Sequence, residues 1–235
     1  MLVPVIIILL LLVLIIYFNN KKEHFDTNPI DKLDAVIYIN LENRQDRKDL
    51  ILKELEKINV PESKIHKVSG VYIPKNGHKG CVQSHIIALN LIKLNNWDKV
   101  LILEDDAELN VDTEEFKKQL NEMLNYIENN KWDVVMLATA HEQKIDINGQ
   151  NNITKIKFAT TASSYIINKN YIDKILYLFN YCNNMMQHSQ WTEKGHEKYA
   201  LDQIWRDLQD KDTWLGFKTN LIKQRNISST TNENM

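Results

Sequence analysis

The chain has few of the residues that interrupt regular structure or cross-link distant segments. Its 235 residues include 6 glycines, 4 prolines and 2 cysteines, and no tract of low complexity or internal repeat occurs. Cys81 and Cys182 lie about a hundred residues apart, which excludes a disulfide framework and gives no metal-binding cysteine spacing. One bridge between them stays open; otherwise we expect buried or free thiols.

An excess of positive charge is also missing. The formal net charge is −2, so no global electrostatic attraction to nucleic acid is expected, and we predict no nucleic-acid partner. With 43% hydrophobic residues, the chain is large enough to bury one sizeable core. A single globular domain is the simplest expectation.

One long apolar run is present, over residues 1–18. It is just long enough to span a bilayer as a helix, and it lacks the basic start and small-residue cleavage site of a signal peptide. We therefore expect a single-pass membrane protein with an N-terminal transmembrane anchor. The side of the membrane stays undecided: Lys21 and Lys22 favour a cytosolic domain, whereas sequons at Asn152 and Asn226 suit a lumenal one.

Behind the anchor we expect a polar tether over residues 19–33 and one domain over residues 34–235. Apolar strand-like segments alternate there with amphipathic helix-like segments, which predicts an α/β sheet in mostly parallel order. The expected strands cover residues 34–39, 65–68, 100–103, 132–137, 160–167 and 217–222. The expected helices cover residues 44–58, 81–94, 112–130, 171–180 and 197–208.

Three consecutive carboxylates, Glu104, Asp105 and Asp106, follow the expected strand Val100–Leu103. Crowded like charges at the edge of a core raise the cost of ionising each neighbour. A divalent cation would remove the repulsion, and ligands of open α/β sheets bind at the carboxyl ends of strands. The alternative is an acidic cap on the following helix, solvated by water.

Two further motifs accompany the acidic run. The three are Ile39–Arg47 (INLENRQDR), Gly77–His85 (GHKGCVQSH) and Leu101–Asp106 (LILEDD). In this order and at these separations they resemble glycosyltransferase family 25, which includes lipopolysaccharide and collagen galactosyltransferases. Similar later elements are Trp132–Val135, Thr161–Ile167, Ala200–Asp202 and Gln224–Ser229, so the resemblance covers roughly residues 34–229.

The resemblance implies a GT-A-like nucleotide-sugar-binding sheet flanked by helices. It implies transfer of a hexose, galactose or glucose, from a UDP-sugar to a glycan or protein hydroxyl. Metal assistance by Mn²⁺ or Mg²⁺ is expected, because carboxylate-held cations neutralise a departing diphosphate. On the family's pattern Asp106 is the first choice as metal ligand, with Glu104 on the metal or the ribose. Asp105 is the next donor contact.

Donor-binding candidates follow from the other two motifs. Asn40, Arg44 and Arg47 come just after the first strand, where a guanidinium can pair with phosphate or stack on a base. The alternative for Arg44 and Arg47 is the solvated first turn of a helix. Ser84 and His85 open the helix after the Gly-rich turn. His85 is a catalytic candidate through the motif, and otherwise a structural hydrogen-bonding residue.

Inverting chemistry needs a carboxylate to take the proton of the acceptor hydroxyl. Asp202 matches an acidic position of the family and is our candidate base; an exposed helix acid is the alternative. Glu142 is a weaker rival. The segment 138–156 resembles nothing in the family and is expected to be a mobile loop.

Two other functions compete with transfer. A catalytically silent member would keep the fold and act as a binding or scaffold protein. A phosphoryl-transfer enzyme would need a phosphate-cradling loop, which Gly77–Gly80 matches poorly. His78 and Lys79 also stand where the family usually has an acidic residue, so donor contacts there are expected to differ.

Overall fold

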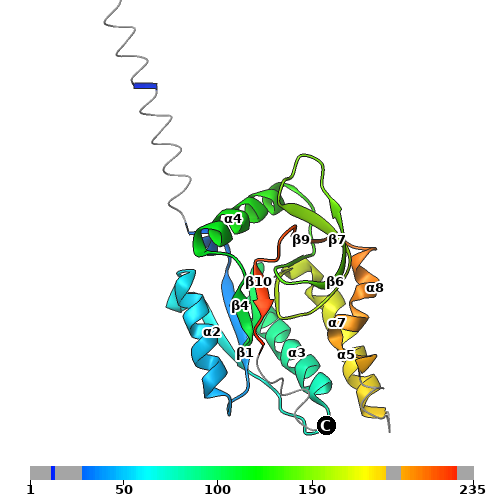
Figure 1. Ribbon diagram of the computed structural model, residues 1–235. Helices are drawn as coiled ribbons and strands as arrows, with labels where there is room; N and C mark the ends of the chain where they lie inside the picture. The colour runs from blue at the N-terminus through cyan, green and yellow to red at the C-terminus, as the bar shows by residue number, and fades with distance from the viewer. Residues whose placement is uncertain (1–11, 14–27, 189–196, 227–235) are drawn as a thin grey trace, which may run out of the picture.

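The computed structural model describes residues 12–13, 28–188 and 197–226 (Figure 1). Within these ranges an eight-stranded sheet has the order β2-β1-β3-β8-β5-β9-β7-β6, and a two-stranded sheet pairs β10 with β4. The strands are β1 Ala35–Asn40, β2 Ile65–Ser69, β3 Lys99–Glu104, β4 Ala107–Leu109, β5 Val134–Met136, β6 Ala140–Asp146, β7 Ile153–Thr160, β8 Ser164–Asn168, β9 Trp214–Phe217 and β10 Ile222–Gln224.

Helices cover both faces of the large sheet because alternate strand residues point to opposite faces. Val36 and Tyr38 face one core and Ile37 and Ile39 the other. The first core includes residues of η1 Pro29–Lys32, α2 Gln45–Lys57 and α4 Thr113–Asn129. The second includes residues of α3 Gly77–Asn95, α5 Ile172–His188 and α7 Leu201–Ile204, with α8 Arg206–Gln209 beside them. Two further 3₁₀ turns are η2 Glu62–Lys64 and η3 Lys169–Tyr171.

The chain reverses its direction of travel across the sheet at β1. From β1 it passes through α2 to β2 on one side, and then through α3 to β3 on the other side of β1. Both β1 pairings are parallel, and Ile39 lies opposite Val68 on β2 and Glu104 on β3. A crevice therefore opens at the carboxyl ends of β1 and β3, where such reversals bind ligands.

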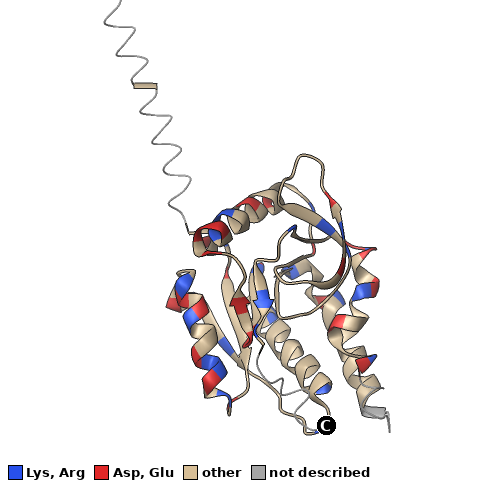
Figure 2. Ribbon diagram, in the orientation of Figure 1, with Lys and Arg blue, Asp and Glu red and all other residues tan. Residues whose placement is uncertain are grey.

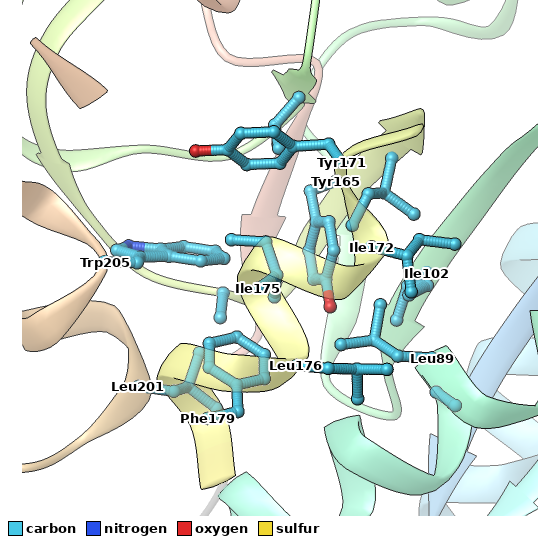
Figure 3. Close-up of a cluster of buried hydrophobic side chains, with 14 of the residues drawn as sticks. Leu89, Ile102, Tyr165, Tyr171, Ile172, Ile175, Leu176, Phe179, Leu201 and Trp205 are labelled. Carbon is cyan, nitrogen blue, oxygen red and sulfur yellow. The ribbon is translucent and has the colours of Figure 1, made fainter. Parts of the chain in front are cut away.

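The core beneath α3 and α5 is built from large side chains (Figure 3). Tyr165 on β8 lies among Ile175, Phe179 and Trp205, and its ring meets that of Trp205 edge-on at 5.5 Å. Tyr165 is 1% exposed. Burial of its ring fixes the side chain, while its hydroxyl still needs a polar partner.

Several expectations about the elements are wrong in detail. The sheet is mixed, because β8 lies antiparallel between β3 and β5 and β7 pairs antiparallel with β6 and β9. The expected loop 138–156 instead forms most of the β6–β7 hairpin. The helix expected over 197–208 includes the two short helices α7 and α8. Strand β7 of this hairpin pairs with β9, and β6 then forms the edge of the sheet. The sequence of the hairpin itself does not predict this pairing.

The N-terminal boundary also differs from the expectation. Ile30 and Leu33, assigned to the tether, are buried against the core, so residues 29–33 are part of the folded domain. The expected anchor over residues 1–18 lies outside the described residues except for Leu12 and Val13. In the part of the chain that the structure describes, no helix is both long and apolar enough to cross a membrane. Cys81 and Cys182 are both free thiols, so no bridge joins them.

Candidate functional site

A pocket of about 250 Å³ opens at the crevice between β1 and β3. Its walls come from segments far apart in sequence: the ends of β1 and β3, the loop after β2, α3, the turn between β7 and β8, α7 and β10. The predicted residues that line it are Asn40, Arg47, Ser84, His85, Glu104, Asp105, Asp106 and Asp202. Of the site residues predicted from the motifs, the fold therefore brings all but Arg44 together.

Asp105 is neutralised by the residues that follow β1. Its Oδ1 accepts a 3.0 Å hydrogen bond from Nη1 of Arg47, and its Oδ2 accepts a 2.9 Å bond from Nδ2 of Asn40. Asn40 also donates to the carbonyl of Arg44 at 3.0 Å. Arg47 is only 5% exposed, so this guanidinium serves a buried ion pair and does not sit in a solvated helix turn.

Asp106 has the opposite environment. Its Oδ1 is buried and has no hydrogen-bond partner among the described residues. Burial raises the pKa of Asp106, and the charges of Glu104 and Asp105 raise it further, to about 7. Its main chain is held by the residue after β10, because the N–H of Arg225 donates to the Asp106 carbonyl at 2.7 Å. A cation beside Asp106 would satisfy the orphaned oxygen and remove the repulsion.

Glu104 ends β3 against the wall formed by α3. Its Oε1 lies 3.2 Å from Nε2 of His85 and 3.3 Å from Sγ of Cys81. Burial by itself raises the pKa of Glu104, but its contacts with His85, together with Cys81 and the charge of Arg47, leave the pKa below its ordinary value. Glu104 is therefore the ionised neighbour that opposes ionisation of Asp106. Figure 2 shows how few charged residues α3 carries, so the polar groups on this wall are mostly uncharged or titratable side chains such as Ser84, Cys81 and His85.

His85 is fully buried, and both of its ring nitrogens are engaged. Nδ1 lies 2.9 Å from the hydroxyl of Tyr165, and Nε2 faces Glu104. A ring held from both sides orients the carboxylate and has no nitrogen left for a substrate. The geometry favours a positioning role for His85 over the catalytic role expected from its motif.

Ser84 and Gly80 fix the loop after β2 to helix α3. The Ser84 hydroxyl accepts from the N–H of Val71 at 2.8 Å and donates to the carbonyl of Gly80 at 2.7 Å. A Cβ on Gly80 would lie 2.3 Å from the Val71 carbonyl oxygen, so only glycine permits this approach. Ser84 thus shapes the pocket through the loop, with its hydroxyl already used.

Asp202 stabilises a strained turn between β7 and β8. Its Oδ2 accepts a 3.1 Å hydrogen bond from the N–H of Thr161, whose φ is +81°. A β-branched residue in this region costs about 1–3 kcal/mol unless its surroundings hold it. Both residues line the pocket, so the strain is located at the site.

The family model for glycosyltransferase family 25, described as a lipopolysaccharide biosynthesis protein, matches residues 75–192. The match spans half of the 235-residue chain and includes helix α3, the acidic turn Glu104–Asp106 and Tyr165. The chain belongs to glycosyltransferase family 25. Membership of this family makes the chain a transferase. No curated protein sequence matches the chain.

Two solved structures of transferases are similar to parts of this structure. One is mannose-1-phosphate geranyltransferase from Thermus thermophilus, with a TM-score of 0.48 and 9% identity over 82% of this chain and 75% of that chain. Another is a glycosyltransferase involved in glycosylation of the major capsid of PBCV-1, with a TM-score of 0.39 and 12% identity over 78% and 92%. The assignment rests on the family match alone.

Two sequence candidates lie outside the site of this family 25 chain. Arg44 does not line the pocket; its Nε and Nη2 donate to the carboxylate of Asp46 at 3.0 and 2.9 Å. Glu142 lies on β6, away from the pocket lining, and its Oε1 pairs with Lys144 at 2.9 Å. Glu142 is therefore separate from the residues that line the pocket, whereas Asp202 is one of them.

Other lining residues were missed by sequence reasoning. Cys81 is one of them, although it lies four residues before His85, a spacing that places both side chains on one helix face. Thr161 gave no signal, because threonine rarely adopts a positive φ. Tyr72, His78 and Gln224 also line the pocket, and Tyr72 is 55% exposed at its mouth.

Proposed function

We propose that this chain transfers a hexose, galactose or glucose, from a UDP-sugar to a hydroxyl of a glycan or protein, with inversion at the sugar carbon. The observation that carries the proposal is the Asp106 carboxylate, which lines the pocket with a buried, unpartnered oxygen and a pKa of about 7. A buried carboxylate of this kind can bind a cation, and the cation in turn can bind the phosphates of a ligand. Family 25 membership supplies the reaction class.

The residues present fit a hard divalent cation. Asp106 and Glu104 offer carboxylate oxygens of the kind that Mn²⁺ and Mg²⁺ prefer, whereas Asp105 is already neutralised by Arg47. When bound, the ion would offset the negative charge that develops on the departing UDP. Asp106 and Glu104 are the proposed ligands.

The chain's own residues position the donor. Asn40 and Arg47 fix Asp105 and with it the turn that carries Asp106, so the carboxylates are arranged before any ligand arrives. The loop Gly70–Ile73, held by Ser84, forms the wall beside them. Tyr72 is the exposed ring at the mouth, and we propose that it covers the nucleotide base.

Asp202 is the proposed general base. Its Oδ2 is fixed by Thr161, so the second oxygen, Oδ1, can take the proton of the acceptor hydroxyl as that oxygen attacks the sugar carbon. The bond from the sugar carbon to the UDP oxygen breaks as the new glycosidic bond forms. The hydrogen bond from the N–H of Thr161, whose φ is positive, contributes to the orientation of the carboxylate.

We also propose that residues 1–18 anchor this domain to a membrane. The proposal rests on the uninterrupted apolar run in the sequence. Membranes from cells that express the full chain should retain it after alkaline carbonate washing. Release of the chain by that wash would contradict an anchor.

The transfer reaction is tested with the purified full chain in detergent. It is incubated with UDP-galactose or UDP-glucose, with Mn²⁺ or with a chelator, and released UDP is measured. We expect metal-dependent release with one of the donors, and its loss in Asp106→Ala. Donor binding without release, in the presence of candidate acceptors, would support a silent scaffold protein instead. Indifference to both donors would overturn the proposal.

A further inference from the structure

Three side chains in the pocket wall converge on one point, and the proposed transfer uses only Glu104 among them as a ligand. Cys81 and His85 on α3 approach Glu104 at the end of β3, with Sγ–Oε1 and Nε2–Oε1 separations of 3.3 and 3.2 Å. All three donor atoms lie within 4.8 Å of one another. They are a thiol, an imidazole and a carboxylate, the donor types that zinc binds in proteins.

The separations suit a tetrahedral ion. With zinc–sulfur bonds of about 2.3 Å and zinc–nitrogen or zinc–oxygen bonds of about 2.0–2.1 Å, ligand atoms in a tetrahedron lie roughly 3.3–3.6 Å apart. The two contacts with Glu104 are within a few tenths of an ångström of these values. Cys81 and His85 are four residues apart on one helix, so α3 presents both donors on the same face.

The outer contacts also match a metal-binding histidine. Zinc-bound imidazoles are normally oriented by a hydrogen bond at their second nitrogen. Here Nδ1 of His85 meets the Tyr165 hydroxyl at 2.9 Å, which directs Nε2 toward Glu104. Tyr165 is itself fixed in the core below α3 and α5 (Figure 3). The donor set is therefore preorganised by the fold.

Access and charge are compatible with an ion. Cys81, His85 and Glu104 all line the pocket, so an ion can enter from it and keep its fourth position toward it. Burial raises the pKa of the Cys81 thiol well above its ordinary value, and Glu104 and Asp202 raise it further. A divalent ion would reverse this balance, and the thiol proton would be released to solvent as the sulfur–metal bond forms.

We propose that Cys81, His85 and Glu104 form a binding site for a soft divalent cation of the zinc class, open to the pocket. The site is separate in chemistry from the carboxylate site for Mn²⁺ or Mg²⁺ and shares only Glu104 with it. Because one carboxylate cannot serve both ions fully, occupancy by zinc would oppose occupancy of the hard-cation site. This last consequence depends on the proposed function; the binding itself does not.

Cobalt(II) absorption tests the site without any measurement of turnover. The reduced, metal-free full chain in detergent is titrated with Co²⁺, which reports a thiolate ligand through a charge-transfer band and a tetrahedral site through intense visible bands. We expect about one equivalent to give both signals, and Zn²⁺ to bleach them. Absence of the charge-transfer band from the wild-type chain would overturn the proposal.

Variants assign the signal to the three residues. Cys81→Ser should lose the charge-transfer band, whereas Cys182→Ala, which removes the chain's other cysteine, should keep it. Tyr165→Phe should keep the band and bind Zn²⁺ about 10–100-fold more weakly. A band that survives in Cys81→Ser would refute the assignment. Circular dichroism melting checks that each variant folds.

Asp106→Ala separates this site from the transfer site. It should abolish metal-dependent UDP release and leave the cobalt spectrum unchanged, because Asp106 is not among the three donors. Loss of the cobalt band in Asp106→Ala would contradict a separate site. If the wild-type chain shows the band but no transfer, the soft-metal site stands and the proposed function fails.

Discussion

Arg47 and Asp105 form a buried ion pair, with Nη1 of the guanidinium 3.0 Å from Oδ1 of the carboxylate. Their side chains are only 6% and 10% exposed, and 58 residues separate them in sequence. The pair compensates Asp105 from within the protein, and His85 lies beside Glu104 in the same way. Asp106 differs, because its Oδ1 has no hydrogen-bond partner among the described residues.

Breaking this pair should be costly. Arg47→Met is expected to lower the free energy of unfolding by about 3–5 kcal/mol, because it leaves the Asp105 charge buried without its partner. Urea denaturation followed by circular dichroism measures the change. Lys93→Met is the control, since Lys93 pairs with Asp173 at an exposed surface and should cost at most about 1 kcal/mol. Equal losses in the two variants would contradict a special role for the buried pair.

Asp106→Asn should stabilise the metal-free protein increasingly as pH rises. The pKa of Asp106 is about 7 in the folded protein and lower when unfolded, so the folded state holds this proton more tightly. Stability from this group is full below the unfolded pKa and is lost as pH rises through 7. Asparagine mimics the protonated carboxyl, so its advantage should grow between pH 5 and pH 8, by about 2–3 kcal/mol.

Thermal melting at pH 5, 6, 7 and 8 in the presence of a chelator measures this advantage. Saturating Mn²⁺ should reduce it at pH 8, because the wild-type carboxylate then has its cation. Asp173→Asn is the matched control, since its carboxylate is 81% exposed and lies far from the acidic turn in sequence. An Asp106→Asn advantage that does not depend on pH would show that the carboxylate ionises without hindrance.

Asp202→Asn should reduce transfer while preserving the turn. Asparagine retains an oxygen that can accept from the N–H of Thr161 but cannot take a proton, so turnover should fall about 10²–10⁴-fold with donor affinity nearly unchanged. Glu142→Gln is the control for a carboxylate outside the pocket and should keep wild-type turnover. If Asp202→Asn is fully active and only Asp202→Ala fails, Asp202 is structural.

Gly80→Ala should displace the loop after β2. Its methyl group would meet the Val71 carbonyl oxygen at 2.3 Å, a backbone contact that cannot yield cheaply. UDP-sugar affinity, measured by isothermal titration calorimetry, should fall at least about tenfold because that loop lines the pocket. Gly149→Ala is the control. The φ of +77° at Gly149 makes alanine strained, but an added Cβ would meet no other residue within 4 Å. Gly149 does not line the pocket. The substitution should cost stability and leave donor affinity unchanged.

Local pattern was enough for most elements of the first half of the chain. Windows of about 15 residues are sufficient to predict the apolar strands β1 and β3 and the amphipathic helices α2 and α4. The β6–β7 hairpin does not follow from such windows, because β6 is polar and exposed and β7 pairs with β9, which comes some 60 residues later. Strand identity at a sheet edge depends on partners that the local sequence does not contain.

The sequence by itself determined that three carboxylates end a buried strand, and that two further motif segments accompany them along the chain. Adjacency along the chain and the alternation of strands and helices are sufficient for that much. Only the tertiary structure decided which partners each group has. Arg47 and Asn40 hydrogen-bond to Asp105. Tyr165 and Glu104 contact the two ring nitrogens of His85. The Oδ1 atom of Asp106 has no hydrogen-bond partner among the described residues. The physical reason is that charge compensation and desolvation act through space, between residues that the fold brings together from distant positions in the chain.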